Sequence, residues 1–356
     1  MLLGPPALAL DEDGFTDKLA ETWGMSELER AGEEYTGGAR ISQDLDVGGS
    51  LKQIGEKGMD SLEGLVKSTL RSCLLILVIT LLCGLAEGLE ASTGGDPLKL
   101  TTLAAILSIT AVAVGDVHSL LGMGEETISN MEALGDILLP AVSMATAASG
   151  TPASAAVKYG ITIIFSDLLI RLIHRLLIPL CYAYVAAGVA WAALGNEGLK
   201  RVGALLKWLI TILLSVFLLA FIAYLNLSGV ISGGADAATV KAAKFTISNM
   251  VPVVGGVISD TAETLLAGAG VLRNAAGVFG MLAVLGICMV PFLNLGLHYL
   301  LYKCTAALAA TASGNGRVTG LIEQLSTAFG LILAMTGSCG VLLVVAMIST
   351  VSTVAG

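Results

Sequence analysis

The sequence is 356 residues long, with 55% of its positions hydrophobic, 13% charged, a mean hydropathy of +0.85 and a formal net charge of −9. This composition is typical of integral membrane proteins and excludes an ordinary water-soluble domain, which needs more polar surface. The negative charge argues against nucleic acid as a partner.

The sequence lacks the motifs of common nucleotide-binding and acyl-transfer sites, since no GxxxxGK[ST], GxGxxG or GxSxG pattern occurs in it. Its six cysteines lie in or beside apolar stretches without CxxC spacing, as small buried hydrophobic residues do. The three histidines, His118, His174 and His298, lack metal-ligand spacing. We therefore expect no enzymatic activity, no metal and no cofactor.

The first residues read MLLGPPALAL, in which Ala7-Leu8-Ala9 has the small-x-small form of a signal-peptidase site. The basic start and most of the apolar core of a signal peptide are missing. Residues 1–9 are therefore either the remnant of a signal peptide or an ordinary terminus. With a signal, the region that follows would begin outside the cytoplasm.

Residues 10–70 are polar, and residues 11–71 hold 14 of the 28 acidic and 7 of the 19 basic residues. The tetrapeptides SELE at 26–29 and SLKQ at 50–53 fit the capping-box pattern of a helix start. Four apolar residues then share one helical face: Leu51, Ile54, Leu62 and Leu65. The pattern predicts short extracytoplasmic helices, the second of which lies on the membrane or on a partner.

From residue 71 onward, long runs without charge dominate, and a spanning helix needs roughly 17 to 25 mostly apolar residues. The runs are 72–86, 100–115, 137–157, 176–196, 208–235, 274–302 and 324–356. The weaker stretch 304–316 adds an eighth if the chain breaks near Pro291-Phe292-Leu293-Asn294. We therefore expect an all-α, polytopic membrane protein with seven or eight spans, in which 71–115 forms the first hairpin.

Lys and Arg in short loops favour the cytoplasmic side of the membrane. The segment 116–134 holds four acids and no Lys or Arg, whereas 197–207 holds Lys200, Arg201 and Lys207. We expect the first segment to be an outer loop, the second to be cytoplasmic, and the N-terminus to be extracytoplasmic. One or three crossings would then lie between the two segments.

The pentapeptide TISNM occurs at 127–131 and again at 246–250, an offset of 119 residues. At nearly this offset, Gly160 matches Gly280, and Gly195-Asn196 matches Gly314-Asn315. These landmarks predict an internal duplication, with membrane repeats at 116–234 and 235–356. Duplicated halves are a recurring plan of membrane transport proteins, and the parity of crossings per copy decides between inverted and parallel repeats.

The stretch 244–274 is too polar to span a membrane comfortably and too apolar for a free loop. A broken or re-entrant element that presents carboxylates would suit an ion or solute path, whereas an amphipathic surface helix is the alternative. Proline and paired glycines would break the helix, and acids at i and i+3 would share one face. The candidate residues are Asn249, Pro252, Gly255, Gly256, Asp260, Glu263, Thr264 and Asn274.

A second set of polar residues falls at helical spacing between 158 and 175. It consists of Lys158, Thr162, Asp167, Arg171, His174 and Arg175. Intramembrane ion pairs are costly and usually face the interior of a bundle. The second copy lacks charges at the equivalent positions, which favours the alternative of a helix that lies flat at the membrane interface with its basic face in water.

The run TVKAAKFTISNMVPVVGGVISDTAETLLAGAGVLRNAAGVFG, around residues 240–280, resembles the signature region of the stage III sporulation protein AE family. The shared positions are, in order, Lys-Phe, Pro-Val-Val-Gly, an aspartate and Asn-Ala-Gly. The resemblance extends over most of 60–350, and its specificity is concentrated in 240–280. The chain departs from the family mainly in its clipped N-terminus.

The resemblance implies an endospore-forming bacterium and a multi-pass protein in the mother-cell membrane around the forespore. It implies the other proteins of the same operon as partners, among them an ATPase and ring-forming proteins, and a forespore membrane partner reached through the complex. Together these look like a channel or secretion-like apparatus needed for late forespore gene expression. The family implies no catalytic residues.

Three functional hypotheses follow. The chain is a membrane core of such a channel complex, or it is a self-contained secondary transporter for a small solute or ion, or it is a passive scaffold. In the transporter, Asp260 and Glu263 would bind the coupling proton or cation.

Overall fold

The computed structural model describes residues 21–41, 45–91, 98–250, 255–312 and 315–351, although the side chains of 62–63, 88–91, 98–99, 228–250, 255–268, 312 and 351 are not described. This part of the chain is helical apart from its turns. The helices are α2 (Met25–Thr36), α3 (Val47–Ala91), α4 (Leu98–Ala148), α5 (Pro152–Leu172), the π-helical turn η1 (Ile173–Leu177), α6 (Ile178–Leu194), α7 (Glu197–Met250), α8 (Gly255–Ala312) and α9 (Gly316–Val351).

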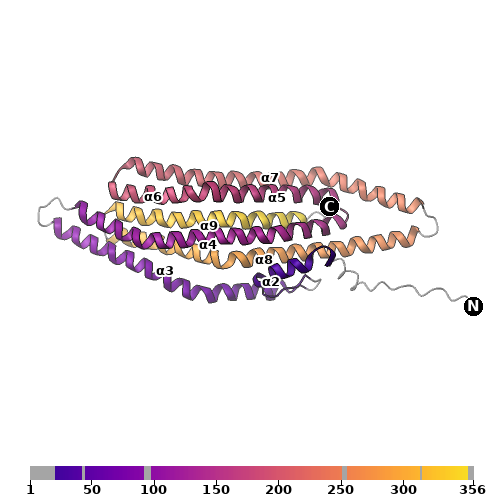
Figure 1. The fold of residues 1–356 in the computed structure, drawn as a ribbon, viewed down its shortest axis with the longest axis horizontal. Helices are drawn as coiled ribbons and strands as arrows, with labels where there is room; N and C mark the ends of the chain where they lie inside the picture. Colours follow the sequence, from indigo (N-terminus) through magenta and orange to yellow (C-terminus); the bar gives the residue numbers. More distant parts are fainter. Residues whose placement is uncertain (1–20, 42–44, 92–97, 251–254, 313–314, 352–356) are drawn as a thin grey trace, which may run out of the picture.

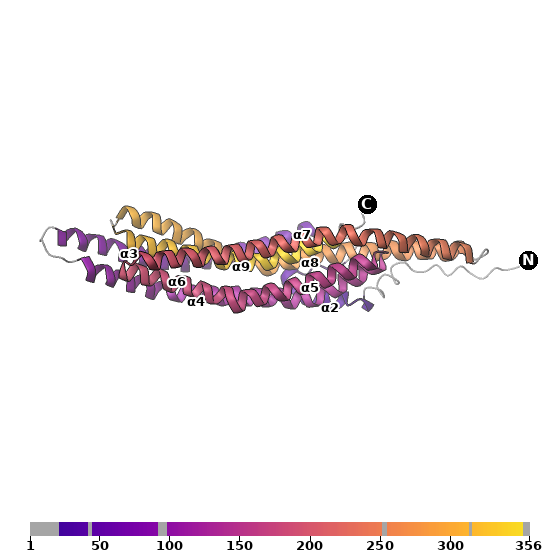
Figure 2. The same ribbon diagram turned by 90° about the horizontal axis from the view of Figure 1, so that it is seen from above.

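The long helices run back and forth between the two ends of an elongated bundle (Figures 1 and 2). Helices α5, η1 and α6 form one continuous rod, and α8 and α9 lie centrally among the others. Helix α8 has 58 residues, which at about 1.5 Å per residue gives about 87 Å. Since the hydrocarbon core of a bilayer is about 30 Å thick, the bundle is longer than the membrane that it would cross.

Six helical stretches among the described residues are long and apolar enough to span a membrane, by length and composition. They are Val47–Glu87, Leu100–Ala148, Pro152–Leu194, Glu197–Leu227, Ala269–Thr311 and Gly316–Thr350. Large apolar side chains face outward on these helices, including Leu74, Leu82, Leu85, Val216 and Leu219. Such a surface suits lipid as the surrounding solvent, and the prediction of an all-α polytopic membrane protein is confirmed.

The six stretches are fewer than the seven or eight runs in the sequence because two expected interruptions are absent. Segment 116–134 was expected to be an outer loop, and this is wrong: it is the middle of α4, so two apolar runs belong to one helix. Likewise Pro291 lies inside α8 without ending it. A proline is tolerated in such a helix where neighbouring groups satisfy the freed backbone carbonyl.

The helix break expected in 244–274 lies between two antiparallel helices. Helix α7 ends at Met250 and α8 begins at Gly255 (Figure 1). Pro252, which the sequence suggests as the breaker, is outside the described residues.

In both copies of the proposed duplication, the chain runs through the matched residues in the same direction along the bundle. The α6–α7 turn at Gly195-Asn196 and the matching turn between α8 and α9 lie at the same end of the bundle (Figure 1). A duplication with these landmarks would therefore consist of parallel copies. The first TISNM lies in the middle of α4, whereas the second forms the end of α7. The chain therefore continues as a helix past the first copy of this motif, and a helix ends at the second copy.

The polar N-terminal region packs against the membrane helices. The Glu29 carboxylate accepts a hydrogen bond from the Ile41 amide at 2.5 Å, and the Lys57 ammonium donates to the Glu34 carbonyl at 2.9 Å.

The predicted capping boxes are wrong. Helix α2 follows Gly24 without a side-chain cap, and α3 begins at Val47, where Asp46 accepts from the Gly49 amide at 2.8 Å.

A buried polar group joins α3, α4 and α8. The Tyr302 hydroxyl donates to the Asp116 carboxylate at 2.6 Å, and the His298 ring lies 3.3 Å from the Thr69 hydroxyl and 2.9 Å from the Asn294 carbonyl. Tyr302 is fully buried. Buried polar atoms cost free energy unless they are paired, so these contacts fix how the three helices face one another.

We predict that Gly286→Ala loosens the docking of α2 on α8. A Cβ atom at this position would overlap the backbone carbonyl of Tyr35, which cannot move without α2. Overpacking of this kind costs about 1–3 kcal/mol. Thermal unfolding of the detergent-solubilised protein, with proteolysis between α2 and α3 as a second measurement, checks the prediction. Gly296→Ala on the same helix has open space around its Cβ and is the control. Equal stability of the two variants would contradict the prediction.

We also predict that Tyr302→Phe destabilises the bundle by about 1–3 kcal/mol, because it leaves the Asp116 carboxylate without its buried donor. Tyr299→Phe, three residues earlier, removes a hydroxyl that makes no hydrogen bond in the described part of the chain, and it should be near neutral. The measurement is the melting temperature of both variants in the same detergent. A Tyr299→Phe loss as large as that of Tyr302→Phe would refute the assignment.

Candidate functional site

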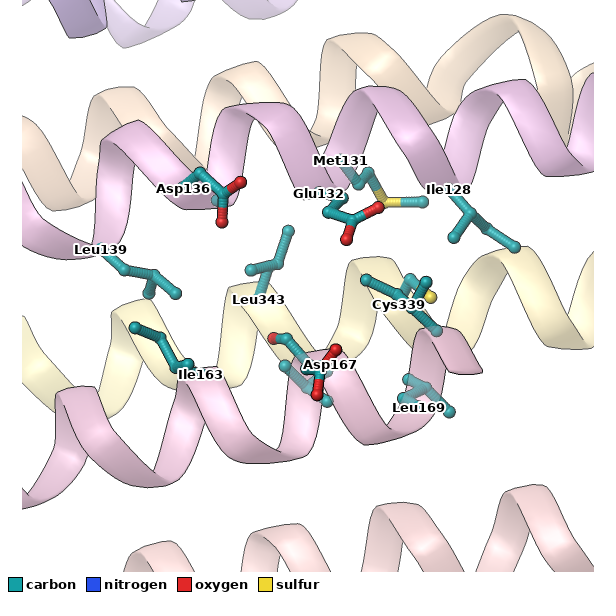
Figure 3. Close-up of a pocket in the computed structure, with 14 residues that line it drawn as sticks. Ile128, Met131, Glu132, Asp136, Leu139, Ile163, Asp167, Leu169, Cys339 and Leu343 are labelled. Atoms are coloured by element: carbon teal, nitrogen blue, oxygen red, sulfur yellow. The ribbon is translucent and has the colours of Figure 1, made fainter. Parts of the chain in front are cut away.

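A cavity of about 270 Å³ lies between α4, α5 and α9 (Figure 3). Its walls are mostly aliphatic, but three carboxylates open into it: Glu132 and Asp136 from α4, and Asp167 from α5. The remaining lining residues are Ile128, Met131, Gly135, Leu139, Ile163, Ser166, Leu169, Ile170, Cys339, Leu342 and Leu343. We call this space the acidic cavity.

Local structure explains how the three acids meet. Glu132 and Asp136 are four residues apart, so they lie on the same face of α4. The chain then reverses at residues 149–151, where Gly150 adopts φ 95°, a conformation that suits glycine. Pro152 follows at the first turn of α5, where its missing amide hydrogen costs nothing. The tight turn brings α5 back along α4 and places Asp167 opposite the other two acids (Figure 3).

The cavity has more negative than positive charge. The guanidinium of Arg171 pairs with Asp167 at 2.8 Å, and both side chains are more than half exposed. Neither Glu132 nor Asp136 makes an ion pair or hydrogen bond within the part of the chain that the structure describes. The buried Ser166 hydroxyl also lacks a hydrogen-bond partner there. These oxygens are available to a cationic group from outside the chain.

Carboxylates beside an apolar wall attract cations more strongly than carboxylates in water, because the surroundings screen less. Among the described residues, no group of three or more His, Cys, Asp and Glu side chains is arranged to hold a metal ion. The arrangement instead suits a proton, a partly hydrated monovalent cation, or the ammonium or guanidinium of a partner protein.

The predicted polar stripe is divided in the structure. Asp167 lines the acidic cavity, whereas Arg171, His174 and Arg175 are exposed, the last two on the π-helical turn η1. Lys158 is buried and donates to the backbone carbonyl of Ser349. Thr162 is also buried. The helix that carries the stripe runs along the bundle beside α4 and α9 rather than across it (Figure 1).

Most of the predicted signature residues have no described side chain. Asn249 lies near the end of α7, and Gly255, Gly256, Asp260, Glu263 and Thr264 lie in the first turns of α8. Asn274 is exposed, and its side-chain oxygen accepts a hydrogen bond at 3.3 Å from Arg273, which is 2% exposed. The structure does not bring Asn274 to the acidic cavity.

Sequence reasoning missed Asp136 and Ser166 and placed Glu132 in a loop. The one signal that could have found the pair on α4 is its i, i+4 spacing, which counts only if 116–134 is helical. The approach of α5 to the pair depends on the turn at 149–151 and has no signal in the local sequence.

Comparisons with known proteins give the chain its family. No solved structure matches it. A curated relative, the stage III sporulation protein AE of Bacillus subtilis (strain 168), is 21% identical over 247 residues, which are 69% of this chain and 62% of that protein. The chain thus spans less than two thirds of the length of this relative. The family model for stage III sporulation protein AE matches residues 41–354, and the chain therefore belongs to the stage III sporulation protein AE family.

Proposed function

We propose that this chain is the membrane-embedded core component of a mother cell to forespore channel, or secretion-like complex, that is needed for sporulation and late forespore gene expression. Membership of the family supports a role in sporulation, and the six long apolar helices support a location in a membrane. The proposed role is assembly and conduction rather than catalysis, and it uses no cofactor.

This proposal rests on charged side chains that are exposed on the outer surface of the bundle, near its middle. Glu132, Asp136, Asp167, Arg171 and Arg175 are all exposed, on helices that also expose large apolar residues such as Val114, Ile164 and Leu168. Charged side chains are expensive in hydrocarbon and are found beside protein or water. A further protein subunit or a water-filled path beside α4 and α5 would satisfy them, and an assembled channel supplies both.

The partners that we propose are the other proteins of the operon, including an ATPase and ring-forming proteins, and through them a forespore membrane partner. We further propose that the chain lies in the mother-cell membrane around the forespore with its N-terminus extracytoplasmic. Lys200, Arg201 and Arg317 lie at the end of the bundle where α6 meets α7 and α8 meets α9. These basic residues support a cytoplasmic location for that end.

We predict that the triple substitution Glu132→Gln, Asp136→Asn and Asp167→Asn lowers recovery of the ATPase and ring-forming proteins with this chain by about tenfold or more, because interfacial charge pairs are worth several kcal/mol. Heat-resistant spores should fall in parallel. Copurification from sporulating cells and spore counts are the measurements. The control is Glu56→Gln, which removes one exposed acid of α3. Normal copurification and normal spore counts in the triple variant would contradict the proposal.

A self-contained secondary transporter for a small solute or ion is the second candidate, and the acidic cavity is the observation that favours it. The cavity is lined by three acids among mostly aliphatic side chains, as a coupling site for a proton or cation would be. The two candidates differ in whether the chain moves ions alone.

Reconstitution of the purified chain into proteoliposomes separates the candidates. If the chain is a channel component, we expect no flux of protons or monovalent cations above that of empty vesicles. Flux by the chain alone that Asp167→Asn abolishes, and that Glu56→Gln leaves unchanged, would establish the transporter and overturn the channel proposal.

A further inference from the structure

A second cavity, of about 600 Å³, lies at the end of the bundle where α6 and α8 end and α7 and α9 begin (Figure 1). All four helices line it, and small side chains such as Ala306, Ala310 and Gly320 leave room between them. Its volume is in the range of small-molecule and headgroup sites. We call it the basic groove.

The basic groove is positively charged. Lys200, Lys207 and Lys303 line it, and Glu323 is the one acid among its lining residues. Glu323 pairs with Lys303 at 3.8 Å, and Lys200 lies 4.0 Å from Glu197 of the same helix. The Lys207 ammonium makes no ion pair or hydrogen bond within the described ranges. The lining therefore has an excess of cations over acids, which suits an anion.

Two side chains that line the basic groove each carry a buried polar atom without a partner among the described residues. One is the indole N–H of Trp191, whose side chain is 5% exposed, and the other is the side-chain oxygen of Gln324. An indole nitrogen can only donate, whereas an amide oxygen can only accept. Both atoms are shielded from solvent, so the two side chains form packed walls beside the lysines rather than contacts for a ligand.

Backbone packing holds these two side chains in the basic groove. A Cβ atom at Gly188 would overlap the Gln324 amide, and one at Gly320 would overlap the Trp191 ring. The Lys200 ammonium lies 5.0 Å from the centre of the Trp191 ring, in cation–π range. The Trp191 ring and the Lys200 ammonium beside it are therefore positioned before any ligand arrives.

The basic groove also lies where helices that could span the membrane begin and end. Of the six stretches that could span the membrane, two end here, at Leu194 and Thr311, and two begin here, at Glu197 and Gly316. Large apolar side chains on the same helices are exposed near the groove: Leu194, Leu205, Trp208, Leu300 and Leu308. Acyl chains could cover these residues while a headgroup occupies the groove.

We propose that the basic groove binds the phosphate of an anionic phospholipid headgroup. The three lysines contact the phosphate oxygens of a headgroup such as that of phosphatidylglycerol. Inorganic phosphate offers the same anionic oxygens but not the acyl chains. This site is independent of the acidic cavity and of the channel proposal.

The test measures the affinity of the full-length, detergent-purified chain for short-chain phosphatidylglycerol, phosphatidylcholine of the same chain length, and inorganic phosphate. Native mass spectrometry reports lipid binding, and the melting temperature reports all three ligands. We expect specific retention of phosphatidylglycerol, little of phosphatidylcholine, and weak binding of phosphate. Equal retention of the two lipids would overturn the proposal, as would stabilisation by phosphate that lipid does not increase, which would assign the groove to free phosphate.

Two substitutions test the residues. Lys207→Gln should weaken phosphatidylglycerol binding about fivefold, since a lysine near a lipid phosphate contributes about that factor. Lys200→Gln, at another lysine that lines the groove, should weaken binding by a similar factor without unfolding the protein. Arg201→Gln changes a neighbouring exposed cation that does not line the groove, and it is the matched control. Unchanged affinity in both variants, or an equal loss in Arg201→Gln, would refute the proposal.

Discussion

The requirement that every backbone amide and carbonyl be paired where no water is present determines the form of this protein. In hydrocarbon, each unpaired group costs several kcal/mol, and a continuous helix pairs all of them internally. The chain accordingly crosses acidic stretches and prolines without leaving the helix, as α4 does at 116–134 and α8 does at Pro291. Many hydroxyl side chains follow the same rule, since Thr80, Thr146 and Thr336 each donate to the carbonyl four residues earlier.

The same constraint gives polar side chains their importance. Where they are buried and paired, as in the contact of Tyr302 with Asp116, they fix which helix faces which. Where they remain unpaired, they mark places that something else must fill. Two cavities with charged linings are examples, and they have opposite charge: the acidic cavity between α4, α5 and α9, and the basic groove at the ends of α6 to α9.

The opposite charges suggest different occupants. An acidic cavity beside exposed charges on α4 and α5 suits a cationic partner or a hydrated path, which is why the channel complex is the preferred function. A basic groove at the start and end of four spanning helices suits a lipid headgroup at the membrane surface. Membership of the stage III sporulation protein AE family supports a role of the chain in sporulation, whereas the lipid proposal rests on the basic groove alone.

The sequence by itself determined that the apolar helices belong in lipid, and it determined the fold class and the family. Hydropathy, charge-free runs and the signature around 240–280 are local properties of the chain. It could not determine that 116–134 is helical, because a stretch of acids with helical spacing reads equally well as an outer loop. Only the tertiary structure decided that Asp167 meets Glu132 and Asp136, and that Lys200, Lys207 and Lys303 line one groove. Such contacts depend on where the chain turns and on which helix faces pack together. Both are determined by residues that are far apart in the sequence.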